Sequence, residues 1–195
     1  MNSDHDATRR MLLAALAGLP LVSGSVSAST QSGALQKQGS RILVAYFTRT
    51  GNTRVIAGLI HRGLNTDLFE IIPATAYPED YLKTVAQAQQ EQERGFEPPL
   101  KETVPEIASY DTICLGFPIW GTTVPTTVRS FLSQHDLSGK KLIPFITHGG
   151  YGPGDSASVL ARYAPKAQLH EAFVMQADQE RKTMESVNSW LKELV

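Results

Sequence analysis

Cysteine is almost absent from this chain. Cys114 is the single cysteine among 195 residues, so an intramolecular disulfide and a cluster of thiolate metal ligands are both excluded. Cys114 lies within an apolar run, where we expect a buried and unreactive thiol, because reactive thiols need partial exposure and a positive neighbourhood. Protein classes built on disulfides, and chemistry carried by a thiolate, are therefore not expected.

The sequence also has no excess of charge and no long apolar run. The formal net charge is −1, and we find no basic face with interleaved aromatic residues, so nucleic acid is not an expected partner. The longest apolar stretch is too short to span a bilayer. One His-Glu pair occurs without the second histidine of a zinc helix, so no metal site is expected. His135 and His170 are expected at the surface.

What the chain does contain begins with a targeting pattern. Arg9 and Arg10 precede a modestly apolar run, residues 11–22, and small residues follow at Val26 and Ala28. This pattern predicts a signal peptide over residues 1–28, a flexible leader over 29–40 and one folded domain over 41–195. The paired arginines resemble a twin-arginine signal, which exports proteins already folded. The predicted location is outside the cytoplasm, in the periplasm; an ordinary secretory signal and a short unstructured N-terminus are the alternatives.

The remainder of the chain alternates apolar strand-length runs with segments of helical periodicity. Such alternation predicts an α/β domain with a doubly wound, parallel sheet and helices on both faces. Ligands bind such sheets outside the carboxyl ends of the strands, which directs attention to the loops after Phe47, Phe117 and Thr147. The expected strands cover residues 41–47, 68–72, 112–117, 141–147 and 169–175, and the expected helices cover 53–64, 80–94, 125–132, 157–163 and 179–194.

Each of these three loops has an unusual composition. The loop Thr48–Thr53 offers backbone amides at the start of a helix together with neutral side-chain donors, a combination suited to an anion. The loop 116–125 contains Trp120, a flat side chain able to pack on a flat heterocycle. The loop 147–154 contains four glycines, which favours backbone lying close against another group. A capped helix without ligand, a core tryptophan and a plain glycine turn are the simpler readings of each loop taken alone.

Taken together, the loops resemble those of flavodoxins. Residues 42–53 resemble the flavodoxin signature, whose T/S-x-T-G-N-T loop wraps the phosphate of flavin mononucleotide (FMN), and 116–125 and 147–152 resemble the two loops that border its flavin ring. The resemblance implies the five-stranded order 2-1-3-4-5 and FMN as cofactor. The cofactor-binding residues it implies are Thr48, Arg49, Thr50, Gly51, Asn52 and Thr53 for the phosphate, and Pro118, Ile119, Trp120, Gly121, Thr147, His148, Gly149, Gly150 and Gly152 for the ring.

The role of the flavin is left open by the sequence. The resemblance implies electron transfer to a redox partner protein or a small-molecule acceptor, since the flavin carries the redox chemistry and no catalytic protein residue is expected. One alternative is an FMN-dependent NAD(P)H:quinone-type oxidoreductase, and another is a flavin-binding module without catalysis. Removing residues 1–28 removes two aspartates and two arginines and leaves the charge at −1. Family carriers are typically acidic, so this charge weakens the carrier interpretation; an exported location lacks an obvious nicotinamide supply, which weakens the reductase interpretation.

Overall fold

The computed structural model describes residues 41–177 and 180–194, which form an α/β unit. The predicted signal peptide and leader lie outside these residues, as do positions 178–179. The strands are β1 (Ile42–Tyr46), β2 (Asp67–Glu70), β3 (Thr112–Pro118), β4 (Lys141–His148), β5 (Gln168–Leu169) and β6 (Phe173–Gln176). The helices are α1 (Asn52–Leu64), α2 (Tyr81–Arg94), α3 (Thr126–Gln134), α4 (Ser156–Tyr163) and α5 (Glu180–Leu194), with a 3₁₀ turn at Ile107–Ser109 that the sequence did not predict.

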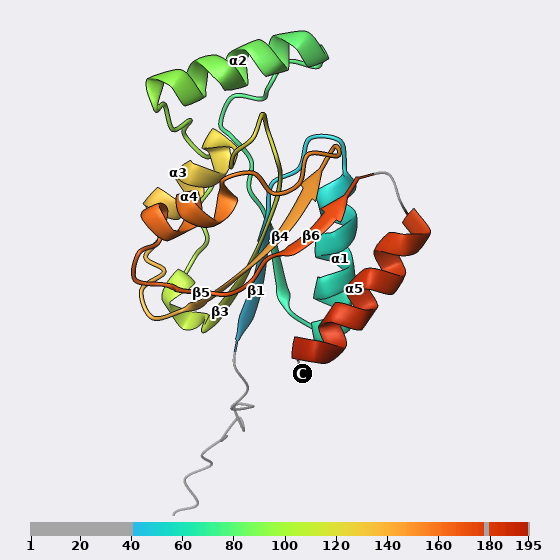
Figure 1. Ribbon diagram of the computed structural model, residues 1–195. Coiled ribbons are helices and arrows are strands. Elements are labelled where there is room, and N and C mark those ends of the chain that lie inside the picture. Colours follow the sequence, from blue (N-terminus) through green and yellow to red (C-terminus); the bar gives the residue numbers. More distant parts are fainter. Residues whose placement is uncertain (1–40, 178–179, 195) are drawn as a thin grey trace, which may run out of the picture. The chain divides into compact units, whose positions relative to one another are not determined.

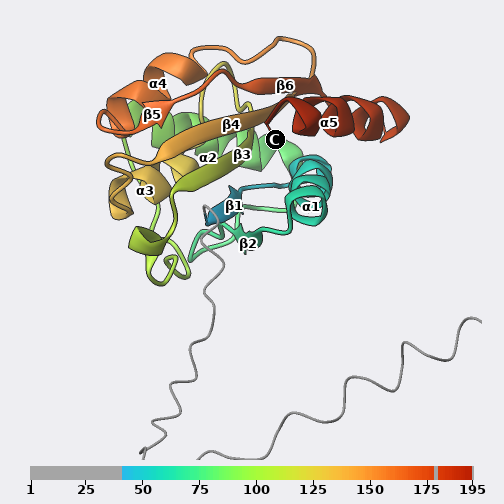
Figure 2. The ribbon, with the colours of Figure 1, turned by 90° about the horizontal axis from the view of Figure 1, so that it is seen from below.

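The sheet is parallel throughout and follows the order β2-β1-β3-β4-β5, which confirms the predicted topology. Helices α1 and α5 lie on one face of the sheet and α3 and α4 on the other (Figures 1 and 2). Strand β1 is buried on both faces: Val44 belongs to the cluster that contains Ile56 of α1, and Leu43 to the cluster that contains Phe131 of α3. Burial on both faces explains why this strand reads as a continuous apolar run.

The predicted fifth strand, 169–175, is divided into β5 and β6, which both pair with β4. Two residues separate Leu142 from Phe145 on β4, whereas three separate their partners Leu169 and Phe173. The extra residue is a bulge of the kind that interrupts a ladder. Pro144 explains its position. Successive residues of β4 direct their backbone N–H and C=O groups alternately toward the two neighbouring strands. The carbonyl of Leu142 accepts from His170 N–H on the side of β5 and β6. Pro144 faces the same side, and it has no N–H to donate there.

His135 is also corrected by the structure. It was expected at the surface, but its residue is 7% exposed. Its Nε2 accepts from Val104 N–H (2.9 Å) and its Nδ1 contacts Phe131 O (2.7 Å). Burial lowers the pKa of this imidazole, against the opposing effect of the Phe131 carbonyl. The imidazole therefore takes the place of a backbone acceptor for Val104 N–H, just before the 3₁₀ turn. Because the two residues are far apart in the sequence, no local pattern predicts this contact.

Helix α2 lies beyond the carboxyl ends of the strands (Figure 1). Asp80 caps its first turn by accepting from Lys83 N–H (2.8 Å), and Gly95 ends it in a left-handed conformation (φ 60°). The predicted bounds, 80–94, agree with the observed helix to within one residue. The attachment of this helix to the rest of the fold was not predicted.

The buried carboxylate of Glu91 attaches α2 to the start of α3. Glu91 is 7% exposed and accepts from Tyr77 Oη (2.7 Å), Thr126 Oγ1 (2.6 Å) and Gln87 Nε2 (2.8 Å). Thr126 is the first residue of α3, whose N-cap Pro125 gives no side-chain hydrogen bond. A carboxylate is stabilised at a helix N-terminus by the amide dipoles. The contact therefore satisfies a buried charge and supplies from another helix the anion that α3 lacks.

The phenol of Tyr77 gives this attachment a measurable signature at high pH. Burial, together with Glu91 and against the hydroxyls of Thr126 and Thr127, raises its pKa from 10.0 to about 12. A raised phenol pKa means that the stabilisation is full below pH 10.0 and is lost as the pH rises toward about 12, because the folded state then holds a proton that the unfolded state has released.

We expect Tyr77→Phe to lower the free energy of unfolding at neutral pH by about 1 kcal/mol, through the lost hydrogen bonds, and to lose less stability than the wild type at alkaline pH. Urea unfolding across this pH range checks the expectation, with Tyr151→Phe as control because Tyr151 is 92% exposed. The difference between wild type and Tyr77→Phe should shrink toward zero as the pH rises from 10.0 toward about 12. A difference that stays constant with pH would contradict the role of Tyr77.

Candidate functional site

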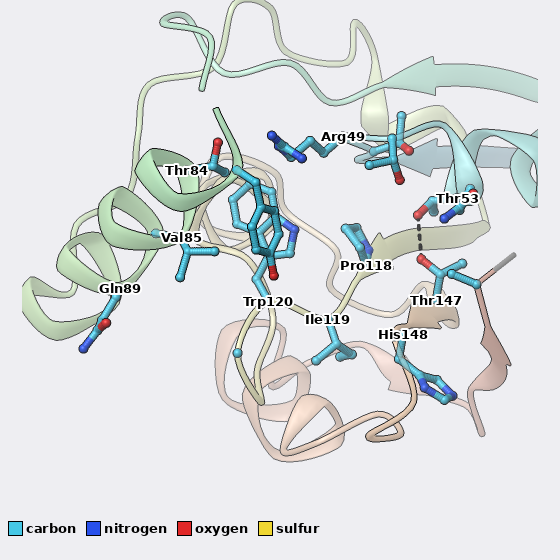
Figure 3. A pocket seen from close by; sticks show the side chains of 18 of the residues that line it. Arg49, Thr53, Thr84, Val85, Gln89, Pro118, Ile119, Trp120, Thr147 and His148 are labelled. Carbon is cyan, nitrogen blue, oxygen red and sulfur yellow. Dashed lines mark hydrogen bonds between the residues drawn. The ribbon is translucent and has the colours of Figure 1, made fainter. Parts of the chain in front are cut away.

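A cavity of about 420 Å³ opens where β1, β3 and β4 end. It is lined by the predicted residues of all three loops except Gly51, Gly150 and Gly152, and by residues of α2 that the sequence did not indicate. Figure 3 shows side chains from the loops and from α2 around the same space. The structure thus brings together three segments that are up to a hundred residues apart in sequence.

The first loop turns directly into α1. Gly51 is the N-cap of this helix with φ 95°, a conformation that favours glycine. Its N–H is donated to Thr48 Oγ1 (3.1 Å), which explains why Gly51 shapes the loop without lining the cavity. The first turn of α1 has neither a side-chain cap nor an acidic residue. Its N–H groups have no partner within the helix, so this end of the cavity is suited to an anion.

The threonines of the first loop differ in environment. Thr50 is exposed, whereas Thr53 is buried and shares a hydrogen bond of 2.9 Å with Thr147 Oγ1 at the end of β4 (Figure 3). This bond joins two loops of the cavity at the floor. The hydroxyl of Thr53 is therefore already engaged, and the sequence could not distinguish it from the exposed one.

Arg49 points toward the start of α2. Its Nη2 donates to Glu79 O (2.8 Å), and its guanidinium carbon lies 5.8 Å from the centre of the Tyr81 ring. The prediction placed Arg49 at the phosphate. In the structure the side chain connects the first loop to the segment that begins α2, so its charge lies on the rim of the cavity.

The second loop is held in shape by backbone pairing. Ile119 N–H donates to Thr147 O (2.8 Å), and Trp120 and Thr123 bond to each other in both directions (3.2 and 3.3 Å) across a turn in which Gly121 has φ 65°. Buried Arg129 of α3 supports the same loop from beneath: its Nε donates to Val124 O (3.0 Å) and its Nη2 to Thr123 Oγ1 (2.9 Å).

Trp120 is half-buried, with its ring edge-on to two aromatic neighbours. The ring centres lie 5.2 Å from Phe47 and 4.8 Å from Tyr77, at interplanar angles of 75° and 82°. Such edge-to-face contacts fix the indole orientation. Tyr77 thus connects the Glu91 contact to the aromatic wall of the cavity, and Gln92 of α2 adds a hydrogen bond to Trp120 O (3.2 Å).

The third loop is fastened to the second. Asp155 N–H donates to Thr122 O (3.0 Å), and a Cβ on Gly154 would lie 1.9 Å from that oxygen. The contact therefore requires glycine at 154. Within the third loop, His148 Nδ1 accepts from the N–H groups of Gly150 (3.0 Å) and Gly152 (3.1 Å). These two glycines, expected at the ring, support the loop from outside the cavity lining, whereas Gly149 and Thr147 line it.

Helix α2 forms a further wall, which the sequence reading missed. Its glutamine- and glutamate-rich face is polar, and local composition gives no signal of a cavity wall, because the attachment partners of Glu91 lie far along the chain. The residues that it contributes to the cavity are neutral: Tyr81, Thr84, Val85, Ala88, Gln89 and Gln92.

The electrostatics of the site are simple. Among the residues that the structure describes, Arg49 is the only lysine or arginine that lines the cavity, and no aspartate or glutamate does. Within the described residues, no group of three histidine, cysteine or acidic side chains is placed to hold a metal ion. Burial raises the pKa of the Cys114 thiol to about 12, which agrees with the unreactive role expected of it. Among the described segments, no helix has the length and apolarity needed to cross a membrane.

Comparison with known proteins identifies solved structures that are similar to this chain. Solved structures similar to the chain include a protein described as a flavoprotein from Bacteroides eggerthii DSM 20697, at 31% identity, TM-score 0.68 and coverage of 80% of this chain and 98% of that one. A second, described in the same way, from Bacteroides uniformis ATCC 8492, has 29% identity, TM-score 0.70 and coverage of 80% and 99%. No curated protein matches the chain.

A third solved structure is described as a flavoprotein in complex with FMN, from Lactobacillus acidophilus NCFM. It shares 20% identity and a TM-score of 0.62 over 75% of this chain and 99% of that one, and at this identity it supports the fold alone. The family model described as Flavodoxin matches residues 41–194. The chain therefore belongs to the flavodoxin family.

Proposed function

We propose that the protein binds FMN in the cavity at the carboxyl ends of β1, β3 and β4 and uses it in electron transfer. The observation that carries the proposal is the meeting of three loops around one cavity, with an uncapped helix start at one end and Trp120 at the other. Membership of the flavodoxin family supports it. When bound, the flavin would supply the redox chemistry, and the protein would set its orientation and exposure.

The proposed division of the cavity follows its donors. The phosphate would lie against the first turn of α1, with Thr48, Thr50 and Asn52 as neutral donors. The ring would lie between the second and third loops, beside Pro118, Trp120 and Gly149. Arg49, held by Glu79 O and close to Tyr81, would contribute its charge from the rim.

A second candidate, an FMN-dependent oxidoreductase acting on a small acceptor, is favoured by the wall of α2. Val85, Ala88, Gln89 and Gln92 present apolar and amide groups, without a carboxylate, to the same cavity. An acidic rim would suit a basic protein partner. A neutral wall instead suits an uncharged small molecule. A flavin-binding module without catalysis is the third candidate and shares the same cofactor site.

The FMN site is tested by removing donors from the first loop. Purified protein should be yellow and release FMN on denaturation. Thr50→Ala combined with Thr53→Ala should weaken FMN affinity about 2- to 13-fold, because the lost hydrogen bond of Thr50 contributes roughly 0.5–1.5 kcal/mol whereas the Thr53 hydroxyl is already bonded to Thr147. Quenching of flavin fluorescence measures the affinity.

Two controls make this test specific. Thr147→Val breaks the internal Thr53–Thr147 bond but leaves the first loop unchanged, so it separates loss of the floor contact from loss of the phosphate donors. Thr75→Ala changes an exposed threonine outside the cavity and should bind like the wild type. Colourless protein that takes up no added FMN would refute the proposal, and unchanged affinity in the double variant would place the phosphate elsewhere.

Rapid mixing with NADH or NADPH distinguishes carrier from reductase. If the protein is a carrier, we expect its flavin to stay oxidised under excess nicotinamide and to be reduced by chemical titration in separate one-electron steps. Bleaching of the flavin absorbance within the mixing experiment would favour the oxidoreductase. Inertness to nicotinamide combined with no electron exchange with any redox protein or small acceptor would favour the non-catalytic module.

We further propose export by the twin-arginine route to the periplasm, on the basis of Arg9, Arg10 and the apolar run that follows them. Conversion of both arginines to lysine preserves the charge and should leave the protein in the cytoplasm, as detected by cell fractionation. A control pair, Arg41→Lys with Arg54→Lys, carries the same change in the folded domain. Undiminished export of the Arg9/Arg10 variant would refute dependence on this route.

A further inference from the structure

His148 holds an unusual hydrogen-bonding state for a loop histidine. Its Nδ1 lies 3.0 Å from the backbone nitrogen of Gly150 and 3.1 Å from that of Gly152. Both partners are N–H donors, so Nδ1 is the acceptor in both bonds. A ring nitrogen accepts only through its lone pair, so the proton of the neutral imidazole must reside on Nε2.

Two other histidines of the described chain have the opposite arrangement. The Nδ1 atoms of His61 and His135 face carbonyl oxygens, Thr66 O at 2.6 Å and Phe131 O at 2.7 Å. A carbonyl can only accept, so these Nδ1 atoms carry a proton. In His135 the Nε2 accepts from Val104 N–H, which fixes the Nδ1–H tautomer. His135 is therefore an internal reference for the Nδ1–H tautomer.

The two bonds to His148 determine the path of the third loop. Gly150 and Gly152 have φ values of 127° and 75°, positive values that turn both amides back toward the imidazole. Neither glycine lines the cavity, whereas Gly149, between the ring and this turn, does. Figure 3 shows the His148 ring directed away from Pro118 and Trp120. His148 therefore lines the cavity beside Gly149 and at the same time holds the turn that follows.

We propose that His148 is a positioning residue, which acts through its Nδ1 acceptor to hold the turn 149–152 and thereby keeps Gly149 at the cavity edge. The role requires only a hydrogen-bond acceptor at the position of Nδ1. A different acceptor atom at that position would hold the turn equally well. The Oδ1 of asparagine stands at this distance from the backbone, whereas the Oε1 of glutamine stands one bond further out. The proposal concerns the protein with or without bound FMN.

The tautomer is tested directly in the wild-type protein. Long-range ¹H–¹⁵N correlation spectra of histidine-labelled protein at neutral pH distinguish protonated from unprotonated ring nitrogens. We expect His148 as the Nε2–H form and His135 as the Nδ1–H form in the same spectrum, assigned by single His→Gln variants. An Nδ1–H, doubly protonated or rapidly averaging His148 ring would overturn the proposal, and this outcome does not depend on any variant or ligand.

The role of the acceptor is tested by three substitutions at one site. His148→Ala and His148→Gln should accelerate solvent exchange of the Gly150 and Gly152 amide hydrogens about fivefold each, corresponding to about 1 kcal/mol per lost bond. His148→Asn should restore slow exchange. His170→Asn, at an exposed position in the β5–β6 bulge, is the matched control. Equal exchange rates in the alanine, glutamine and asparagine variants would overturn the proposal.

A third measurement connects the turn to the cavity and rests on the proposed FMN function. Release of FMN should be faster in His148→Ala and His148→Gln than in the wild type and His148→Asn. If wild-type protein binds no FMN, the function proposed above fails while the tautomer and exchange results still decide the role of His148. If FMN binds but its release is the same in all four proteins, the turn does not position the cavity edge, and that part of the proposal is wrong.

Discussion

The buried carboxylate of Glu91 is the contact on which the shape of the site depends. Every other helix packs against the sheet, but α2 lies beyond the strand ends (Figure 1), so it needs a separate attachment. Glu91 provides it through Tyr77 and Thr126 at the start of α3. A buried charge left without these partners would be strongly destabilising, and for this reason the contact holds α2 in one place. The wall that α2 gives to the cavity follows from it.

A common physical logic runs through the rest of the site. The polar groups that shape the loops are satisfied by the protein itself: Arg129 by Val124 O and Thr123 Oγ1, Asp155 N–H by Thr122 O, and His148 by two glycine amides. The loops are therefore fixed before any ligand enters. Because ordering a loop costs roughly 1–2 kcal/mol per residue, a fixed loop leaves more of the ligand's contact energy for binding.

The sequence was sufficient for the features that depend on local pattern. Continuous apolar runs such as 41–47 predicted strands buried on both faces, and the composition of three loops predicted where the cavity would lie. Gly95 marked the end of α2 by its residue type. In each of these cases the residues that determine the local structure are neighbours in the chain, so the sequence pattern alone is enough to predict it.

The features that escaped prediction depend on partners far apart in the chain. By local composition the glutamine-rich face of α2 resembles a solvated surface. The contact that places it against the cavity joins Glu91 to Thr126, which are 35 residues apart in the sequence. His135 became buried because Val104, 31 residues away, requires an acceptor. The division of the fifth strand depends on Pro144 in the neighbouring strand β4. The missing N–H of Pro144 affects the pairing of whichever strand lies on that side, and the sequence does not show which strand this is.

The balance of charge in the cavity has a further implication for how an anionic ligand would be bound. A site with several cations draws anions from a distance, over about the 8 Å screening length of physiological salt. Here the one lysine or arginine among the lining residues, Arg49, is already engaged by Glu79 O and lies near Tyr81. Attraction must then come from backbone dipoles and hydroxyls, whose fields fall off within the first turn of the helix. Such short-ranged donors bind well only if they are aligned in advance. The internal hydrogen bonds of Thr53, Arg129 and His148 provide that alignment, so in this protein the rigidity of the loops takes the place of charge.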